Sequence, residues 1–165
     1  MLPAVSRMAG RSYSGRLTVS FIKFSKDEHG LSLFHVDDPK YRALGAWIIT
    51  DISVYMQVAL DALAMIDDVA KGEEPFEPWS SEHYDVAFTR NGLKFRNLYV
   101  ETEEGEYTLA EAREAVEEYW RFLSSQPENP HLEREYRPDL PQWQADLLQW
   151  EEVWERTHPY RGRLF

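Results

Sequence analysis

The sequence contains no cysteine. This absence excludes disulfide bonds, zinc sites with cysteine ligands and catalysis by a thiol. It is typical of a reducing compartment, and we expect the protein to be cytoplasmic. The most apolar region, residues 43–69, is interrupted by four aspartates and is too polar to cross a membrane. Residues 1–15 hold only a four-residue apolar patch, so we expect no secretion signal.

Motifs for metal binding and catalysis are also lacking. The five histidines show neither HxH nor HxxxH spacing, so we expect no metal and interpret each histidine as a turn or surface residue. No phosphate-loop, dinucleotide-binding or GxSxG motif occurs. Adjacent acids at 37–38 and 67–68 are interpreted as a turn and a solvated helix edge. We therefore expect no cofactor and no enzyme, while a catalytic site assembled only by folding stays open as a third possibility.

Basic residues are scarce beyond the N-terminal segment. The chain has 18 Lys and Arg against 29 Asp and Glu, a net charge of −11. Residues 1–26 hold five of the basic residues and no acid, which leaves 13 basic against 29 acidic residues, a balance of −16. Such an acidic surface repels phosphate backbones and attracts cationic partners, so we expect no direct nucleic-acid partner. The basic N-terminal segment is the one place where nucleic-acid binding stays open. We expect no membrane partner either. Solubility alone is the plain alternative explanation of the charge.

Length and composition predict one packed domain. The chain has 165 residues, of which 43% are apolar and 14% aromatic, and a chain of this length buries roughly 70% of its unfolded surface. We divide it into a flexible lead-in at 1–15, an α+β core at 16–124, and a proline-rich wrap with a tryptophan-rich helix at 125–165. The last part is expected to belong to the same domain as the core.

The clearest periodic stretch is residues 50–72. Apolar residues recur there every three or four positions from Ile52 to Ala70, which predicts one long amphipathic helix. The side chain of Thr50 or Asp51 would cap its start, and Gly72 would end it in the left-handed conformation.

Two β-hairpins flank this helix. Alternating apolar residues at 16–24 and 31–36 predict the first. The second is predicted at 83–89 and 93–99, where Asn91 and Gly92 suit a type I′ turn. Leu98 or Tyr99 would extend the apolar face of its second strand.

Two further helices complete the predicted fold. The capping-box spacing of Thr108 and Glu111 starts one. Its predicted inward face carries Leu109, Ala112, Val116, Tyr119, Trp120 and Leu123. An apolar stripe predicts another helix at 142–157. The predicted fold class is α+β, with one antiparallel sheet from two β-hairpins packed on the long helix, in the order ββ-α-ββ-α, plus the additional C-terminal helix.

The densest chemical signal lies at 101–118, which has eight acids and one base, Arg113. Acids are also favourable at a helix N-terminus, so a solvated outer face is the plain interpretation. The functional interpretation is a surface that mimics nucleic-acid phosphates and steers a basic protein onto itself. The residues predicted to bind that partner are Glu101, Glu103, Glu104, Glu106, Glu111, Glu114 and Glu118.

A stripe of Trp143, Trp150 and Trp154 follows the predicted C-terminal helix. Such spacing is what core packing requires. If the helix were loosely attached, the rings would instead form an anchor for a protein partner, because Trp is enriched at the energetic centres of interfaces. This gives the alternative function of a non-catalytic interaction or scaffold protein.

The middle of the chain resembles the YacL-like family of small acidic bacterial proteins and the immunity proteins of contact-dependent and other polymorphic toxin systems. The matching stretches cover about 80 residues and are Gly45–Trp47, Ala70–Glu73, Trp79, His83–Phe88, Asn91-Gly92, Tyr107–Leu109 and Tyr119–Phe122. The N-terminal extension and the end from Gln126 depart from the family outline. The resemblance implies an immunity protein that binds and neutralises a cognate toxin, often a basic nuclease. It implies no catalytic residue.

Overall fold

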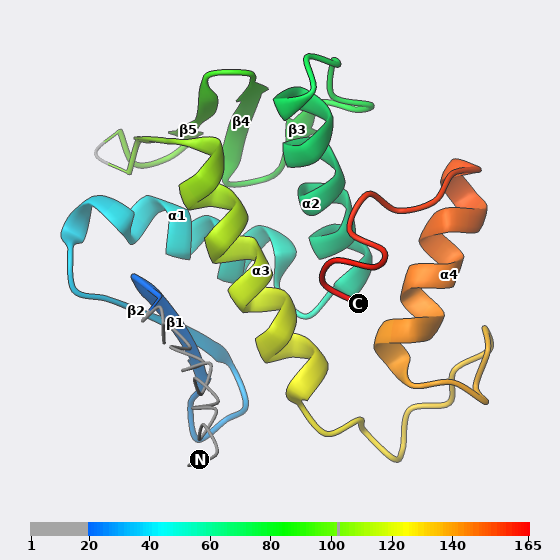
Figure 1. The fold of residues 1–165 in the computed structure, drawn as a ribbon. Coiled ribbons are helices and arrows are strands. Elements are labelled where there is room, and N and C mark those ends of the chain that lie inside the picture. The colour runs from blue at the N-terminus through cyan, green and yellow to red at the C-terminus, as the bar shows by residue number, and fades with distance from the viewer. Residues whose placement is uncertain (1–19, 102) are drawn as a thin grey trace, which may run out of the picture.

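The computed structural model describes residues 20–101 and 103–165 (Figure 1). In these ranges four α-helices and two antiparallel sheets form a mixed fold, so the predicted α+β class is confirmed. The expected lead-in at 1–15 and the start of the predicted first strand lie outside the described residues. Within the described ranges, no helix has the length and apolar character needed to span a membrane.

The two hairpins do not join into one sheet, which corrects that part of the prediction. Strand β1 (Ile22–Lys26) pairs with β2 (Ser32–Val36) alone. The chain then forms a 3-10 turn and helix α1 (Arg42–Trp47). Figure 1 shows α1 lying between this hairpin and the second sheet. The hairpins are therefore kept apart by a helical layer, and β1 packs on α3 through Phe24, whose ring centroid is 4.7 Å from that of Tyr119.

The predicted long helix is broken near its start. Residues Ile48–Ile52 form a π-helical turn continuing α1, and Ser53 then adopts φ 53° and ψ −127°. Helix α2 (Met56–Ala70) begins only after this break. Because Ile48 and Ile52 are buried in the same core as α2, the apolar period continues across the break and hides it.

The predicted caps of this helix have different outcomes. The Thr50 hydroxyl donates to the backbone oxygen of Ala46 at 2.7 Å, inside the preceding helical segment. The Asp51 carboxylate accepts a 2.9 Å hydrogen bond from the indole N–H of Trp79. Neither side chain caps α2, so both N-cap predictions are wrong. Gly72 has φ +86° just after the helix, as predicted.

The second sheet has four strands in the order β3-β4-β5-β6. The predicted hairpin is present as β4 (Tyr84–Thr89) and β5 (Gly92–Asn97). Short edge strands, β3 (Trp79–Ser80) and β6 (Gly105–Tyr107), extend it on both sides. With two and three residues, these strands are too short to show an alternating pattern.

The turn of this hairpin is not the predicted type I′ turn. Its central residues are Arg90 and Asn91, because Thr89 pairs with Gly92, and neither has a positive φ. The unusual conformation falls on Gly92, with φ +139°. A Cβ atom there would lie 2.2 Å from the backbone oxygen of Tyr107 in β6.

Replacing Gly92 with alanine should therefore lower the free energy of unfolding by about 2–3 kcal/mol, since it combines backbone strain with a backbone clash. Gly30 is the matched control: its φ is +79° but nothing lies within 4 Å of an added Cβ. Gly30→Ala should cost about 1 kcal/mol. Urea denaturation of both variants checks this, and equal costs would contradict the close approach of β5 to β6.

Helix α3 (Leu109–Ser125) begins as predicted. The Thr108 hydroxyl accepts from the Glu111 amide at 3.1 Å, and the Glu111 carboxylate accepts from the Thr108 amide at 3.0 Å, which confirms the capping box. The inward face of α3 is confirmed at Ala112, Val116, Tyr119, Trp120 and Leu123, which are buried. Residues 126–141 form the expected irregular wrap, and α4 (Gln142–Trp154) follows it.

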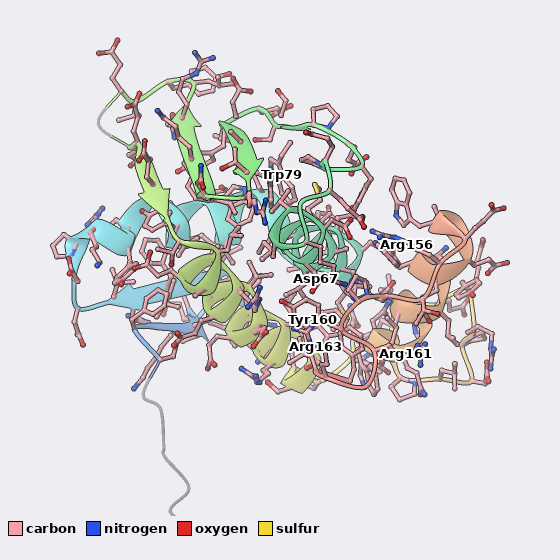
Figure 2. The ribbon with its side chains drawn as sticks, turned by 45° about the horizontal axis from the view of Figure 1, so that its top comes forward. Asp67, Trp79, Arg156, Tyr160, Arg161 and Arg163 are labelled. Carbon is pink, nitrogen blue, oxygen red and sulfur yellow. The ribbon has the colours of Figure 1, made fainter. Side chains whose placement is uncertain are left out.

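Residues 156–165, here named the C-terminal clasp, fold back onto α2. Arg156 donates to both carboxylate oxygens of Asp68, at 2.8 and 3.1 Å, and Arg163 lies 3.1 Å from Asp67. Figure 2 shows Tyr160 and Arg163 beside Asp67. Both aspartates are only 5% exposed, so their interpretation as a solvated helix edge is wrong. Lys71, one turn later at the end of α2, also pairs with Asp67 at 2.6 Å. The two arginine partners lie 88 and 96 residues later in the chain.

His158 of the clasp corrects the prediction that every histidine is a turn or surface residue. It is buried, with Nε2 2.9 Å from the backbone oxygen of Leu60 and Nδ1 accepting from the Tyr160 amide at 3.1 Å. Because a carbonyl oxygen only accepts, these contacts fix the neutral tautomer that carries its proton on Nε2.

Candidate functional site

The seven predicted glutamates come from three consecutive elements. Glu101, Glu103 and Glu104 lie in the β5–β6 loop, Glu106 lies in β6, and the other three lie along α3. The loop leads through β6 directly into α3 (Figure 1). We refer to the surface carried by these seven residues as the acidic face. Its members differ in what they contact.

Three of the seven carboxylates have no partner among residues 20–101 and 103–165, and we call these the free carboxylates. Glu101, Glu104 and Glu114 are exposed, and none of them makes a hydrogen bond or ion pair with a residue that the structure describes. Their carboxylates face solvent. These three are the members of the acidic face that are most available to a partner.

Four of the carboxylates have internal partners. Glu103 accepts from the Tyr84 hydroxyl and the Asn97 amide, both at 3.3 Å. The other three carboxylates form ion pairs. Glu106 pairs with Lys94 at 3.2 Å, Glu111 with Lys40 at 3.7 Å, and Glu118 with Arg121 at 3.5 Å. Sequence spacing indicates only the pair of Glu118 and Arg121, which are three positions apart on α3. The other partners lie on other elements.

Glu111 is the most strongly engaged of the four. Besides capping α3, it accepts a 3.0 Å hydrogen bond from the Tyr41 hydroxyl. Burial, the largest single influence, opposes its ionisation, yet the hydrogen bonds from Thr108 and Tyr41 together with the charge of Lys40 hold the pKa of Glu111 below its usual range. Glu111 therefore serves the fold of this region and contributes little free charge.

An apolar tip stands next to the free acids and was not predicted from sequence. Strand β5 ends at Asn97, so Leu98 and Tyr99 do not extend its buried face as expected. Leu98 and Val100 are each 43% exposed and Tyr99 is 76% exposed. We refer to Leu98, Tyr99 and Val100 as the apolar tip. The signal that could have found it is a run of three large apolar residues placed immediately before an acidic loop.

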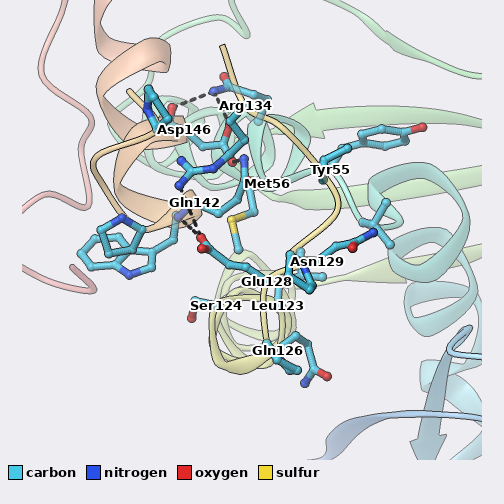
Figure 3. A pocket seen from close by; sticks show the side chains of 18 of the residues that line it. Tyr55, Met56, Leu123, Ser124, Gln126, Glu128, Asn129, Arg134, Gln142 and Asp146 are labelled. Carbon is cyan, nitrogen blue, oxygen red and sulfur yellow. Dashed lines mark hydrogen bonds and ion pairs between the residues drawn. The ribbon is translucent and has the colours of Figure 1, made fainter. Parts of the chain in front are cut away.

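A groove of about 1090 Å³ lies on another part of the molecule. Figure 3 shows its walls, formed by the start of α2, the end of α3, the wrap and the start of α4. Tyr55, Met56 and Trp143 supply apolar lining. Its polar groups bond mainly to one another: Gln57 donates to the backbone oxygen of Asp146 at 2.7 Å, and Gln142 donates to the Asp146 carboxylate at 2.9 Å.

The tryptophan stripe is mostly part of the core. Trp150 is buried and its indole N–H donates to Asp61 at 2.8 Å. Trp154 is half-buried, with its ring centroid 4.4 Å from that of Phe76. Only Trp143, also half-buried, lines the groove. This arrangement agrees with the core-packing interpretation and leaves the groove as the place where a partner could reach α4.

No cluster of three or more His, Asp or Glu side chains within residues 20–101 and 103–165 has an arrangement that could hold a metal ion. The acidic face and the apolar tip offer a partner exposed carboxylates and exposed apolar side chains. No protein-family model, curated protein or solved structure matches this chain, so its resemblance to the YacL-like family and to toxin immunity proteins stays a prediction from the residues quoted above.

Proposed function

We propose that this protein is an immunity protein that binds a basic bacterial toxin, such as a nuclease, through the acidic face and so neutralises it. The observation that carries the proposal is a set of three exposed carboxylates with no partner among the described residues, on a chain of net charge −11. They are Glu101, Glu104 and Glu114. A nuclease is basic where it binds phosphates, so complementary potentials would favour this pairing.

The engaged acids have a different role in this proposal. Glu103 ties the β5–β6 loop to β4 and β5 through Tyr84 and Asn97, and Glu111 fixes the start of α3. They hold the free carboxylates in place, and a prearranged binding surface loses less entropy on association.

Reversing the three free charges tests the proposal. The variant Glu101→Lys, Glu104→Lys, Glu114→Lys should associate at least about tenfold more slowly at low salt with the catalytic domain of the toxin encoded beside this chain's gene. The difference from the wild type should shrink between about 50 mM and about 300 mM salt, because screening weakens charge steering. Stopped-flow mixing measures both rates, and co-expression with the toxin measures protection.

The matched control reverses Glu28, Glu74 and Glu135, which are exposed residues outside the acidic face. This variant has the same net charge as the first, so it should retain most of the wild-type association rate. Equal slowing by both variants would show a general charge effect, and no slowing by the first would contradict binding through the acidic face.

The alternative function, an interaction or scaffold protein, is favoured by the groove beside Trp143. Exposed Tyr55 and Leu132 line this groove. In the same binding assay, a Tyr55→Ala, Leu132→Ser variant that lost affinity while the charge-reversed variant kept it would assign binding to the groove and contradict binding through the acidic face. A wild type that does not bind the toxin domain would leave the groove and the alternative function.

A further inference from the structure

The apolar tip differs from ordinary exposed apolar residues. Single exposed apolar side chains are common on soluble proteins, but Leu98, Tyr99 and Val100 are consecutive and lie on a loop beyond the end of β5. Contiguous exposed apolar groups with a polar rim are typical of interaction sites. Here the rim is acidic, because Glu101 follows the tip directly and Glu104 lies in the same loop.

Hydrogen bonds hold the tip in one conformation. The Asn97 side-chain oxygen accepts from the amides of Tyr99 and Val100, both at 2.9 Å. The Leu98 amide donates to the backbone oxygen of His83 at 2.9 Å, and the Glu103 amide donates to that of Val100 at 3.0 Å. The backbone is thus fixed while the side chains stay exposed, so binding through them would cost little conformational entropy.

The chemistry of the tip defines the surface that it would fit. A tyrosine brings a large rigid ring and a hydroxyl, and Tyr is among the residues that dominate binding energy at interfaces. The free carboxylates of Glu101 and Glu104 would require cationic groups on the partner, around the recess that receives the tyrosine ring. The complementary surface is therefore an apolar recess edged by Lys or Arg.

We propose that the apolar tip is the anchor of the toxin interface, with Tyr99 inserted into an apolar recess whose rim of Lys or Arg pairs with Glu101 and Glu104. This inference rests on the proposed function and assigns different roles to the carboxylates and to Tyr99 within the same surface. The carboxylates set the rate of association and its salt dependence, whereas Tyr99 sets the lifetime of the complex.

Tyr99→Ala tests the anchor against the same toxin catalytic domain. The variant should weaken binding by about 30-fold or more, which is the effect of a residue at an energetic centre of an interface. The loss should appear mainly in the dissociation rate and persist at high salt, while the salt dependence of association stays as in the wild type. Tyr99→Phe should recover most of the affinity, because the ring supplies most of the contact.

The control is Val153→Ala, which removes an exposed apolar side chain from the outer surface of α4; it should change affinity by less than about twofold. Unfolding midpoints of both variants should match the wild type, because both side chains are mostly exposed. If the wild type binds with charge-dependent association but Tyr99→Ala binds equally well, the anchor is overturned and the proposed function stands. If the wild type does not bind the toxin domain, the proposed function fails and the anchor with it.

Discussion

Replacing Trp150 with alanine should lower the free energy of unfolding by about 3–5 kcal/mol. The side chain is 1% exposed, and its ring centroid lies 4.4 Å from that of His158 and 6.3 Å from that of Phe76. Truncation would leave a cavity where α4, the clasp and the 73–78 segment meet. It would also remove the indole N–H that donates to Asp61 at 2.8 Å, leaving a partly buried carboxylate without that donor.

Trp143→Ala is the matched control on the same helix. Trp143 lies in the first turn of α4, half-buried against the groove, so its loss should cost about 1 kcal/mol. Denaturant unfolding followed by circular dichroism gives both values. One cooperative transition in each variant would support the prediction that 125–165 belongs to the same domain as the core. Equal, small costs would show that α4 is loosely attached and would favour the stripe as a partner anchor.

The stability of the protein should respond to pH through two groups with opposite signs. Burial lowers the pKa of His158 from its usual 6.5 to about 4. The unfolded chain then binds more protons, so His158 reduces stability as the pH falls from 6.5 to about 4. Burial raises the pKa of Asp61 from 3.8 to about 6, against the opposing hydrogen bond from Trp150. Asp61 therefore reduces stability as the pH rises from 3.8 to about 6.

Each effect is on the order of 3 kcal/mol over its range, and single variants separate them. Relative to the wild type, His158→Gln should gain stability as the pH falls from 6.5 to 4, because the variant has no imidazole to charge. Asp61→Asn should gain relative stability as the pH rises from 4 to 6. Urea unfolding at pH 4, 5, 6 and 7 gives the two difference curves. Curves with the same slope would contradict the burial of one of the two groups.

Local signals in the sequence predicted the parts of the fold that depend on neighbouring residues. The capping box at Thr108 and the inward face of α3 require only contacts within one helix or a consistent stripe. The break at Ser53 could not be predicted, because the helical segments on both sides of it bury apolar residues in one core and keep the period intact. The separation of the two sheets depends on α1 packing between them, which no strand pattern encodes.

The candidate site also combines features that local sequence predicts with features that only tertiary contacts determine. The sequence predicts seven acids as one binding surface. In the structure, Glu106 and Glu111 are paired with Lys94 and Lys40, and Glu103 accepts hydrogen bonds from Tyr84 and Asn97. Charge counts cannot separate a carboxylate with a partner from a free one. The apolar tip was missed for a related reason, since only the end of β5 decides whether Tyr99 faces the core or the solvent.

The C-terminal clasp also determines when the molecule can finish folding during its own synthesis. His158 reaches back 98 positions to bond Leu60, and Tyr160 is buried in the same core. While a ribosome is still translating the wrap and α4, the face of α2 that the clasp covers must remain open, with Asp67 and Asp68 hydrated. A nascent chain of this protein therefore completes its core only after the clasp has left the exit tunnel.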